Sequence, residues 1–300
     1  MKKFFSAALL FVALFTSYPA FAQSEPLKVV ASFSILADMA KNVGGKFVEV
    51  STLVGPDGDI HTYQPTPEDA KKIVNADVVI INGLGLEGWL ERLMVATKTR
   101  ARVVIATAGL NPRVMYSVKG VPDPHAWQNI PNGRVYIRNI ANAFEQILPS
   151  DAPRIEAQAK AYDTILQSTE QFVINSFKSI PQSQRKIITS HDAFGYFGAA
   201  YRIEVLAPVG VNTEAEASAN DVSKLMTQMK NEGVKVVFFE NMENKQLIQQ
   251  IAHDTGAAIG GTLYSDALSP AGGPATTYVT MFRHNSLSMK SAMLQNRPPK

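Results

Sequence analysis

The chain has 300 residues and no cysteine, and its 29 Lys and Arg residues stand against 26 Asp and Glu, for a formal net charge of +3. This near-neutral balance argues against nucleic acid as a partner and against an electrostatic role at a membrane surface. A chain without cysteine forms no disulfide and carries no lipid on an N-terminal cysteine. We therefore expect no direct membrane anchor, and a monomer as the default state.

The first 22 residues have the three parts of a secretory signal peptide. Lys2 and Lys3 precede an apolar run over 4–15, and Ala20 and Ala22 form the small-residue pattern of a cleavage site. The run is too short to cross about 30 Å of hydrocarbon comfortably, so a membrane-anchoring helix is disfavoured. We expect cleavage after Ala22 and a soluble protein of the periplasm.

The next part of the chain alternates between strand and helix patterns. Continuous Val/Ile runs that alternate with helices indicate parallel strands buried on both faces. The predicted strands are 27–33, 48–54, 77–83 and 102–107, and the helical patterns between them are 35–43, 67–76 and 88–97. These elements predict an α/β lobe over residues 23–149.

A single long helix is predicted within residues 150–181. Ser150 or Asp151 can cap its start, and Pro153 is tolerated in a first turn. One apolar stripe follows at three- and four-residue steps, and its positions are Ile155, Ala159, Tyr162, Ile165, Leu166, Thr169, Phe172, Val173, Ser176 and Phe177. About 28 uninterrupted residues give a helix of roughly 42 Å. We expect this helix to be a stiff connection that allows little movement between the lobes it joins.

A second α/β lobe is predicted over residues 182–300. Its strand patterns are 186–190, 203–208, 234–240 and 257–263, and its helical patterns are 221–233, 244–255 and 277–294. The segment HDAFGYFGAAY, which starts at His191, turns directly from a strand into a short aromatic helix. The predicted fold is α/β, with two lobes that each contain a mainly parallel sheet flanked by helices, joined by one long rigid backbone helix.

Three of the five histidines follow predicted strands. His61 comes after strand 48–54, His125 after strand 102–107, and His191 ends strand 186–190. Ligands of parallel α/β sheets gather at the carboxyl ends of the strands. His253 and His284 lie in polar helical patterns, and we expect them to be ordinary surface residues.

Three imidazoles at strand exits predict a site for one divalent transition-metal ion. Neutral imidazole suits zinc and other transition metals, but three nitrogens leave such an ion short of ligands and of charge compensation. Asp266, after strand 257–263, supplies both. Glu240 competes for that role, but it lies next to a helix start and can serve as a partner of a ligand instead. Asp123 and Asp192 are further candidates for holding an imidazole in the required tautomer.

Five motifs in order resemble the metal-binding substrate-binding proteins of ATP-driven zinc and manganese transporters, in particular the periplasmic class built on one backbone helix. They are GDIHTYQPTPED, INGLGLEGWLERL, DPHAWQNI, HDAFGYFGAAY and LYSDALS. The resemblance covers essentially the whole mature chain. It implies His61, His125, His191 and Asp266 as metal ligands, Zn²⁺ or Mn²⁺ as the transported ion, and the membrane permease of a metal ABC transporter as the partner.

Two departures from the family pattern concern the choice of ion. Zinc-specialised relatives usually carry a loop rich in histidine and acidic residues before the second ligand motif, and the segment NPRVMYSVKGVPDPH has no such tract. Manganese-specialised relatives usually have glutamate where this chain has His191. Three imidazoles favour zinc, which also has the higher intrinsic affinity. Because the two departures point to different ions, the sequence does not decide whether the physiological ion is zinc, manganese or iron.

The sequence disfavours two alternatives to metal transport. A metal-dependent hydrolase needs an open coordination position and a nearby base, and the sequence has no HExxH motif. A surface adhesin or interaction protein is disfavoured by the near-neutral charge and the absence of an anchor signal. We expect a binding protein that is not an enzyme, with a metal affinity that falls below about pH 6 because imidazole must be neutral to bind.

Overall fold

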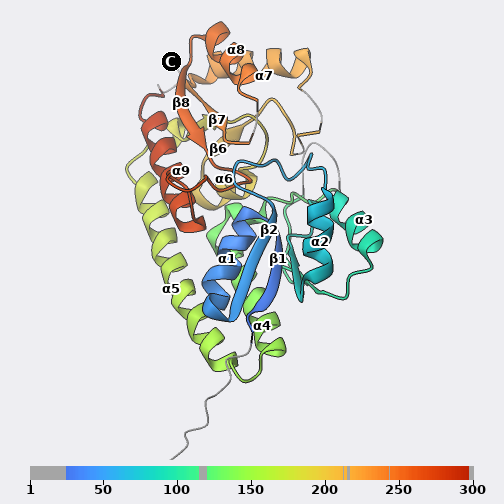
Figure 1. The fold of residues 1–300 in the computed structure, drawn as a ribbon. Coiled ribbons are helices and arrows are strands. Elements are labelled where there is room, and N and C mark those ends of the chain that lie inside the picture. Colours follow the sequence, from blue (N-terminus) through green and yellow to red (C-terminus); the bar gives the residue numbers. More distant parts are fainter. Residues whose placement is uncertain (1–24, 115–119, 212, 215–216, 243, 297–300) are drawn as a thin grey trace, which may run out of the picture.

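The computed structural model of the chain describes residues 25–114, 120–211, 213–214, 217–242 and 244–296. The predicted signal peptide, residues 1–22, lies outside them. Two four-stranded parallel sheets form the framework, and helices cover them (Figure 1). Among the described residues, no helix combines the length and the apolar character needed to cross a bilayer.

The first sheet has the strand order β2-β1-β3-β4. In its centre, Val29 pairs with Val50 on one side and with Val78 on the other. Its strands are β1 (Leu27–Phe33), β2 (Val48–Val54), β3 (Val78–Ile81) and β4 (Arg102–Ile105), and its helices are α1 (Ser34–Gly44), α2 (Pro67–Asn75), α3 (Gly88–Thr97) and α4 (Ile130–Ile147).

The second sheet repeats this arrangement with the order β6-β5-β7-β8. Its strands are β5 (Lys186–Ile188), β6 (Glu204–Leu206), β7 (Val236–Glu240) and β8 (Ala258–Leu263), and its helices are α6 (Gly195–Tyr201), α7 (Ala219–Glu232), α8 (Gln246–Thr255) and α9 (Tyr278–Met293). In both sheets the second strand of the chain order lies at one edge, so the chain crosses back over the first strand to reach the third. This reversal of strand order opens a crevice at the carboxyl ends of the central strands in each half.

All eight predicted strands are confirmed, but their burial differs between centre and edge. The side chains of β3 are almost all buried, as expected of a strand covered on both faces. The edge strands β4 and β8 are largely exposed, and Val103 and Ile105 of β4 are 42% and 47% exposed. A Val/Ile run alone does not distinguish these environments, because edge strands use the same β-branched residues.

Helix α5 (Ala152–Phe177) is the long helix expected between the halves, and it runs along one side of both (Figure 1). Its 26 residues span about 39 Å at about 1.5 Å per residue. Most of the predicted stripe is buried, but Ile165 is 47% exposed. The expectation for Ile165 was wrong because it lies one residue before the buried Leu166, outside the packed face. Helix α4 was not predicted, although Asn129 caps its first turn and Pro131 occupies that turn.

The hydrophobic core is continuous from the first half into the second. One cluster of buried residues includes Phe33 at the end of β1 and reaches Phe197 and Phe282 in the second half. The rings of Phe197 and Phe282 stack with centroids 5.9 Å apart. A smaller separate cluster, which includes Ile188 and Met229, lies between the second sheet and α7 and α8. The halves are thus joined by a packed apolar interface as well as by the chain.

Candidate metal centre

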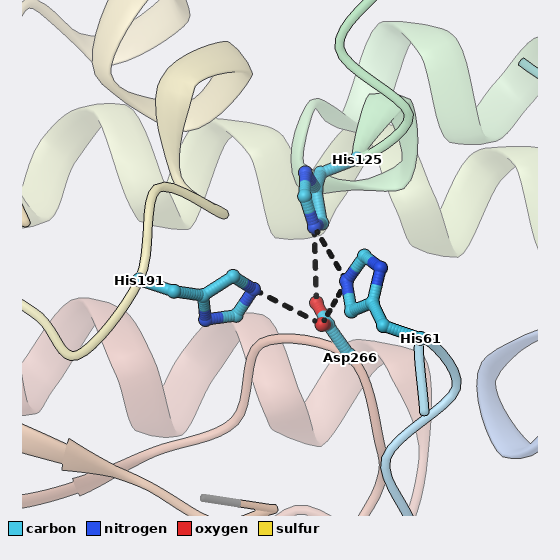
Figure 2. Close-up of side chains that lie close together, drawn as sticks. All are labelled: His61, His125, His191 and Asp266. Carbon is cyan, nitrogen blue, oxygen red and sulfur yellow. Dashed lines mark hydrogen bonds and ion pairs between the residues drawn. The ribbon is translucent and has the colours of Figure 1, made fainter. Parts of the chain in front are cut away.

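Four side chains from four strand exits meet at the junction between the halves (Figure 2). His61 lies in the loop between β2 and α2, and His125 precedes the short helix Ala126–Gln128. His191 follows β5, where it forms a bridge with Val209, and Asp266 follows β8. The structure therefore brings together the four residues that the sequence singled out, two from each half.

The nitrogen and oxygen atoms of these side chains lie close enough to surround one ion. The distance from Nε2 of His61 to Nε2 of His125 is 3.3 Å, and to Oδ2 of Asp266 it is 3.2 Å. Nε2 of His191 also lies 3.2 Å from Oδ2 of Asp266. The four ligand atoms lie within 4.8 Å of one another.

The three distances of 3.2–3.3 Å match those between neighbouring ligands of a small divalent cation. In a tetrahedral site with bonds of about 2.0–2.1 Å, neighbouring ligand atoms are about 3.3–3.4 Å apart. The second oxygen of Asp266 lies 3.7 Å from Nε2 of His125, so the carboxylate turns both oxygens toward the imidazoles. All four residues are buried, with His61 the most exposed at 7%. The site can hold one desolvated cation with three nitrogen ligands and one carboxylate.

Asp123 fixes the orientation of His125. Its Oδ1 lies 2.9 Å from Nδ1 of the imidazole and also accepts a hydrogen bond from the His125 backbone N–H at 3.0 Å. A carboxylate is an acceptor, so Nδ1 carries the hydrogen and Nε2 presents its lone pair to the site. The predicted role of Asp123 therefore agrees with its position.

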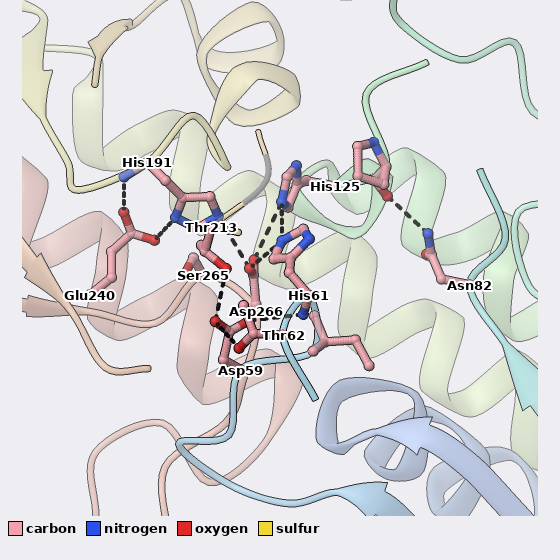
Figure 3. Close-up of polar contacts among 12 residues, drawn as sticks. Asp59, His61, Thr62, Asn82, His125, His191, Thr213, Glu240, Ser265 and Asp266 are labelled. Carbon is pink, nitrogen blue, oxygen red and sulfur yellow. Dashed lines mark hydrogen bonds and ion pairs between the residues drawn. The ribbon is translucent and has the colours of Figure 1, made fainter. Parts of the chain in front are cut away.

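Glu240 has the corresponding position beside His191. Its Oε2 lies 2.9 Å from Nδ1 of the imidazole, and its Oε1 accepts a hydrogen bond from the backbone N–H of His191 at 2.9 Å (Figure 3). The same Oε1 accepts a second bond of 2.9 Å from the backbone N–H of Ser190. The sequence left Asp192 as a candidate for this role, but Nδ1 faces Glu240. The reason is topological: β7 is the direct neighbour of β5 in the sheet, so its last residue lies beside the exit of β5.

The loop that carries Asp266 is held by the opposite half of the molecule. The carbonyl oxygen of Ser265 accepts hydrogen bonds from Nε1 of Trp127 at 2.8 Å and from Nε2 of Gln128 at 2.6 Å. The donors lie two and three residues after His125 in the chain, and both bonds are buried. The position of Asp266 is therefore coupled to that of His125.

A hydrogen bond from Asn82 steadies the other side of the His125 loop. Nδ2 of Asn82 donates to the carbonyl oxygen of Pro124 at 2.9 Å (Figure 3), and the hydroxyl of Tyr136 donates to the Asn82 side chain. Sequence analysis did not identify Asn82, Trp127 or Gln128. Asn82 directly follows β3, so the strand-exit rule that found the histidines could also have found this residue.

The charges around the site favour a bound cation. Burial alone lowers the pKa of His191, but the charges of Glu240 and Asp266 outweigh it and hold that pKa well above its ordinary value of 6.5. Burial raises the pKa of Asp266, but the neighbouring His191 and His125 reverse this and hold it well below its usual value of 3.8. Without an ion, a proton on His191 therefore balances the buried carboxylates, and a metal ion must displace it.

The remaining two histidines lie outside the cluster. Nδ1 of His253 lies 2.9 Å from its exposed neighbour Asp254. His284 is half-buried, and its Nε2 lies 2.9 Å from the carbonyl oxygen of Thr262. Neither residue belongs to the group of four. His253 is a surface residue as expected, whereas His284 is half-buried against β8.

The chain is similar in sequence and fold to known metal-binding proteins. The profile of the family described as "Zinc-uptake complex component A periplasmic" matches residues 29–292. The manganese-binding lipoprotein MntA of Halalkalibacterium halodurans is 33% identical over 271 residues, 90% of each chain. The iron-binding protein YfeA of Yersinia pestis is 31% identical over 287 residues, 92% of each chain. The solved structure of the periplasmic zinc-binding protein TroA of Treponema pallidum gives a TM-score of 0.85 at 28% identity, covering 90% of this chain and 99% of that one.

Proposed function

This chain belongs to the family described as the periplasmic component A of zinc-uptake complexes, and from that premise we propose that it captures a divalent transition-metal ion between its two halves. It then delivers the ion to the membrane permease of an ABC transporter. The ligands are His61, His125, His191 and Asp266. The supporting observation is that three imidazole Nε2 atoms and one carboxylate lie within 4.8 Å of one another in a buried site.

Charge compensation supports a divalent ion in particular. Asp266 contributes one negative charge as a ligand, and Asp123 and Glu240 contribute two more through the imidazoles that they contact. A buried site of this kind is stable only when its charges are paired. A doubly charged cation offsets most of this negative charge without a protonated histidine.

The ion is Zn²⁺ or Mn²⁺, with one ion per chain. Three imidazoles favour zinc by intrinsic affinity, whereas both oxygens of Asp266 face the site and allow a larger coordination number. The relatives named above are described as binding manganese, iron and zinc. Competition between the ions therefore has to be measured on this chain.

The arrangement of the chain follows from this role. Residues 1–22 are removed as a signal peptide, residues 23–149 and 182–300 form the two metal-binding lobes, and residues 150–181 contain the helix that joins them. The protein acts in the periplasm as a monomer. Relatives such as MntA are described as lipoproteins; this chain has no cysteine to carry such a lipid, and we propose that it works without an anchor.

The site is built for retention and not for catalysis. Four protein ligands around one ion leave little room for the open position that catalytic zinc keeps. A hydrolase would also need an open coordination position and a nearby base, and a surface adhesin would need an anchor. Metal capture by the four-ligand cluster needs none of these. Purified holo-protein is expected to turn over no ester or phosphate substrate.

Metal analysis of the protein purified from its own periplasm tests the proposal. We expect close to one equivalent of zinc or manganese per chain, and a competition titration of the two ions on the stripped protein ranks them. Absence of both metals, together with no binding of either ion by the stripped protein, would refute metal transport.

A further inference from the structure

We propose that Thr213 and Asn241 in the second half hold the loop that carries His61, and so set the rate at which the bound ion leaves. This inference rests on the proposed function. The His61 loop is defined here as residues 55–66, between β2 and α2. The two carboxylates of this loop, Asp57 and Asp59, each accept a hydrogen bond from the second half.

Asp59 connects the backbone of a metal ligand to the opposite half. Its Oδ1 accepts a hydrogen bond from the backbone N–H of His61 at 2.8 Å. Its Oδ2 accepts hydrogen bonds from the hydroxyl of Thr62 at 2.9 Å and from the hydroxyl of Thr213 at 2.8 Å (Figure 3). One carboxylate thus positions His61 and at the same time contacts the segment between β6 and α7.

Asp57 forms a second connection two residues earlier. Its Oδ1 accepts a hydrogen bond from Nδ2 of Asn241 at 2.7 Å, and its backbone N–H donates to the carbonyl oxygen of Leu268 at 3.1 Å. The same Asn241 amide also donates to the carbonyl oxygen of Ala267 at 3.2 Å, next to Asp266. The two candidate ligands His61 and Asp266 are therefore held by one set of contacts.

The backbone of the loop depends on these contacts. Asp57 has a φ of 55°, in the left-handed region that non-glycine residues adopt infrequently. Such a conformation persists only where surrounding contacts hold it. Loss of the hydrogen bonds to Asn241 and Thr213 frees the loop to relax and to carry His61 away from the site.

The hydrogen bonds that hold the His61 loop are more exposed to water than those that hold the Asp266 loop, so the site opens at the His61 loop. The bonds from Trp127 and Gln128 to Ser265 are buried, whereas the bond between Thr213 and Asp59 is partly exposed and the one between Asn241 and Asp57 is exposed. Water can replace partly exposed hydrogen bonds at a small cost in free energy. Release of the ion through movement of His61 is thus easier than through separation of the packed core.

The test uses the full chain loaded with Zn²⁺, with release followed by the colour change of an excess of the chelator 4-(2-pyridylazo)resorcinol. Thr213→Val removes the donor at nearly constant shape, and we expect release about 2- to 10-fold faster, the range for one hydrogen bond. Combination with Asn241→Ala should increase the rate further. Thr213→Ser keeps the hydroxyl and should stay within about twofold of the wild type. Thr227→Val, which removes an exposed hydroxyl on α7, is the matched control.

Hydrogen exchange of the metal-free protein supplies a second readout. Amides of residues 55–66 should exchange faster in Thr213→Val than in the wild type, and those of the core strands should not. Release within twofold of the wild type in the double variant would overturn the inference, as would faster release without faster exchange in the His61 loop. A wild-type protein that takes up neither Zn²⁺ nor Mn²⁺ would instead refute the proposed function itself.

Discussion

Nδ1 of His191 lies 2.9 Å from Oε2 of Glu240, and this contact turns Nε2 of the same imidazole toward Asp266. Glu240 is fully buried, and its other oxygen accepts two backbone hydrogen bonds. The carboxylate thus determines which nitrogen of His191 carries the hydrogen. The strength of metal binding depends on this tautomer of His191, because only an unprotonated Nε2 can bind an ion.

Glu240→Gln is expected to weaken metal binding about 10- to 100-fold, the usual cost of losing the partner of a ligand. A glutamine amide whose oxygen keeps the two backbone hydrogen bonds turns its NH₂ group toward Nδ1. This favours the tautomer with hydrogen on Nε2. The measurement is the dissociation constant from a chelator competition titration. Glu232→Gln, which alters the partly exposed ion pair with Lys186, is the control. Equal affinity of Glu240→Gln and the wild type would contradict the role of Glu240 in orienting His191.

His191→Ala should retain the fold but lose more than about 100-fold in affinity, because one ligand is missing and the orienting contact of Glu240 is lost with it. His284 lies on α9 outside the site, so the variant His284→Ala should bind Zn²⁺ with the affinity of the wild type. Isothermal titration with Zn²⁺ compares the two, and circular dichroism verifies the fold. Nearly unchanged affinity of His191→Ala would remove His191 from the ligand set.

Metal affinity should already fall as the pH drops below the neutral range. The pKa of His191 is held well above 6.5 in the metal-free protein, so the proton that the ion must displace is bound at higher pH than for a free imidazole. The onset therefore lies above the value of about 6 expected from ordinary histidine. Titrations between pH 5 and 9, in buffers of different ionisation enthalpy, should show about one proton released per ion at neutral pH. Constant affinity over this range would exclude histidine ligation.

The stabilisation that metal confers should increase with pH. In the metal-free protein, the raised pKa of His191 contributes stability that is fully present below 6.5 and is lost as the pH rises through the raised value. The lowered pKa of Asp266 contributes stability above 3.8 that is lost only in stronger acid. We expect the rise in melting temperature on metal addition to be larger at pH 9 than at pH 6. A larger rise at pH 6 would contradict the protonation of His191 in the metal-free site.

Phe282→Ala should destabilise the whole molecule by about 3–5 kcal/mol, the usual cost of removing a buried aromatic ring. Phe282 is 1% exposed and packs against Phe197 and Tyr278 in the cluster shared by both halves. Leu287→Ala on the same helix, at a position 53% exposed, should have little effect. Urea unfolding followed by circular dichroism should show one transition for the wild type. Two separate transitions would indicate that the halves fold independently.

The elements of the fold could largely be predicted from the sequence. Strand β1 and helix α3 lie at the predicted residues, because apolar runs and apolar periodicity act over short distances. Helix α4 was missed although Asn129 and Pro131 mark its start. The exposure of Val103 was not predictable, since the position of β4 at the edge depends on strand order and not on its own residues.

The sequence by itself determined where the candidate ligands lie in the chain, because the carboxyl ends of parallel strands are recognisable from local patterns. Only the tertiary structure decided which of them meet. His61 and Asp266 are 205 positions apart and come within 3.2 Å of each other through the packing of the two halves. The same packing brings Thr213 to Asp59, whereas the strand order within the second sheet places Glu240 beside His191. Such pairs leave no periodic trace in the sequence, since no local hydrogen-bonding or burial pattern connects residues that meet only across an interface or between neighbouring strands.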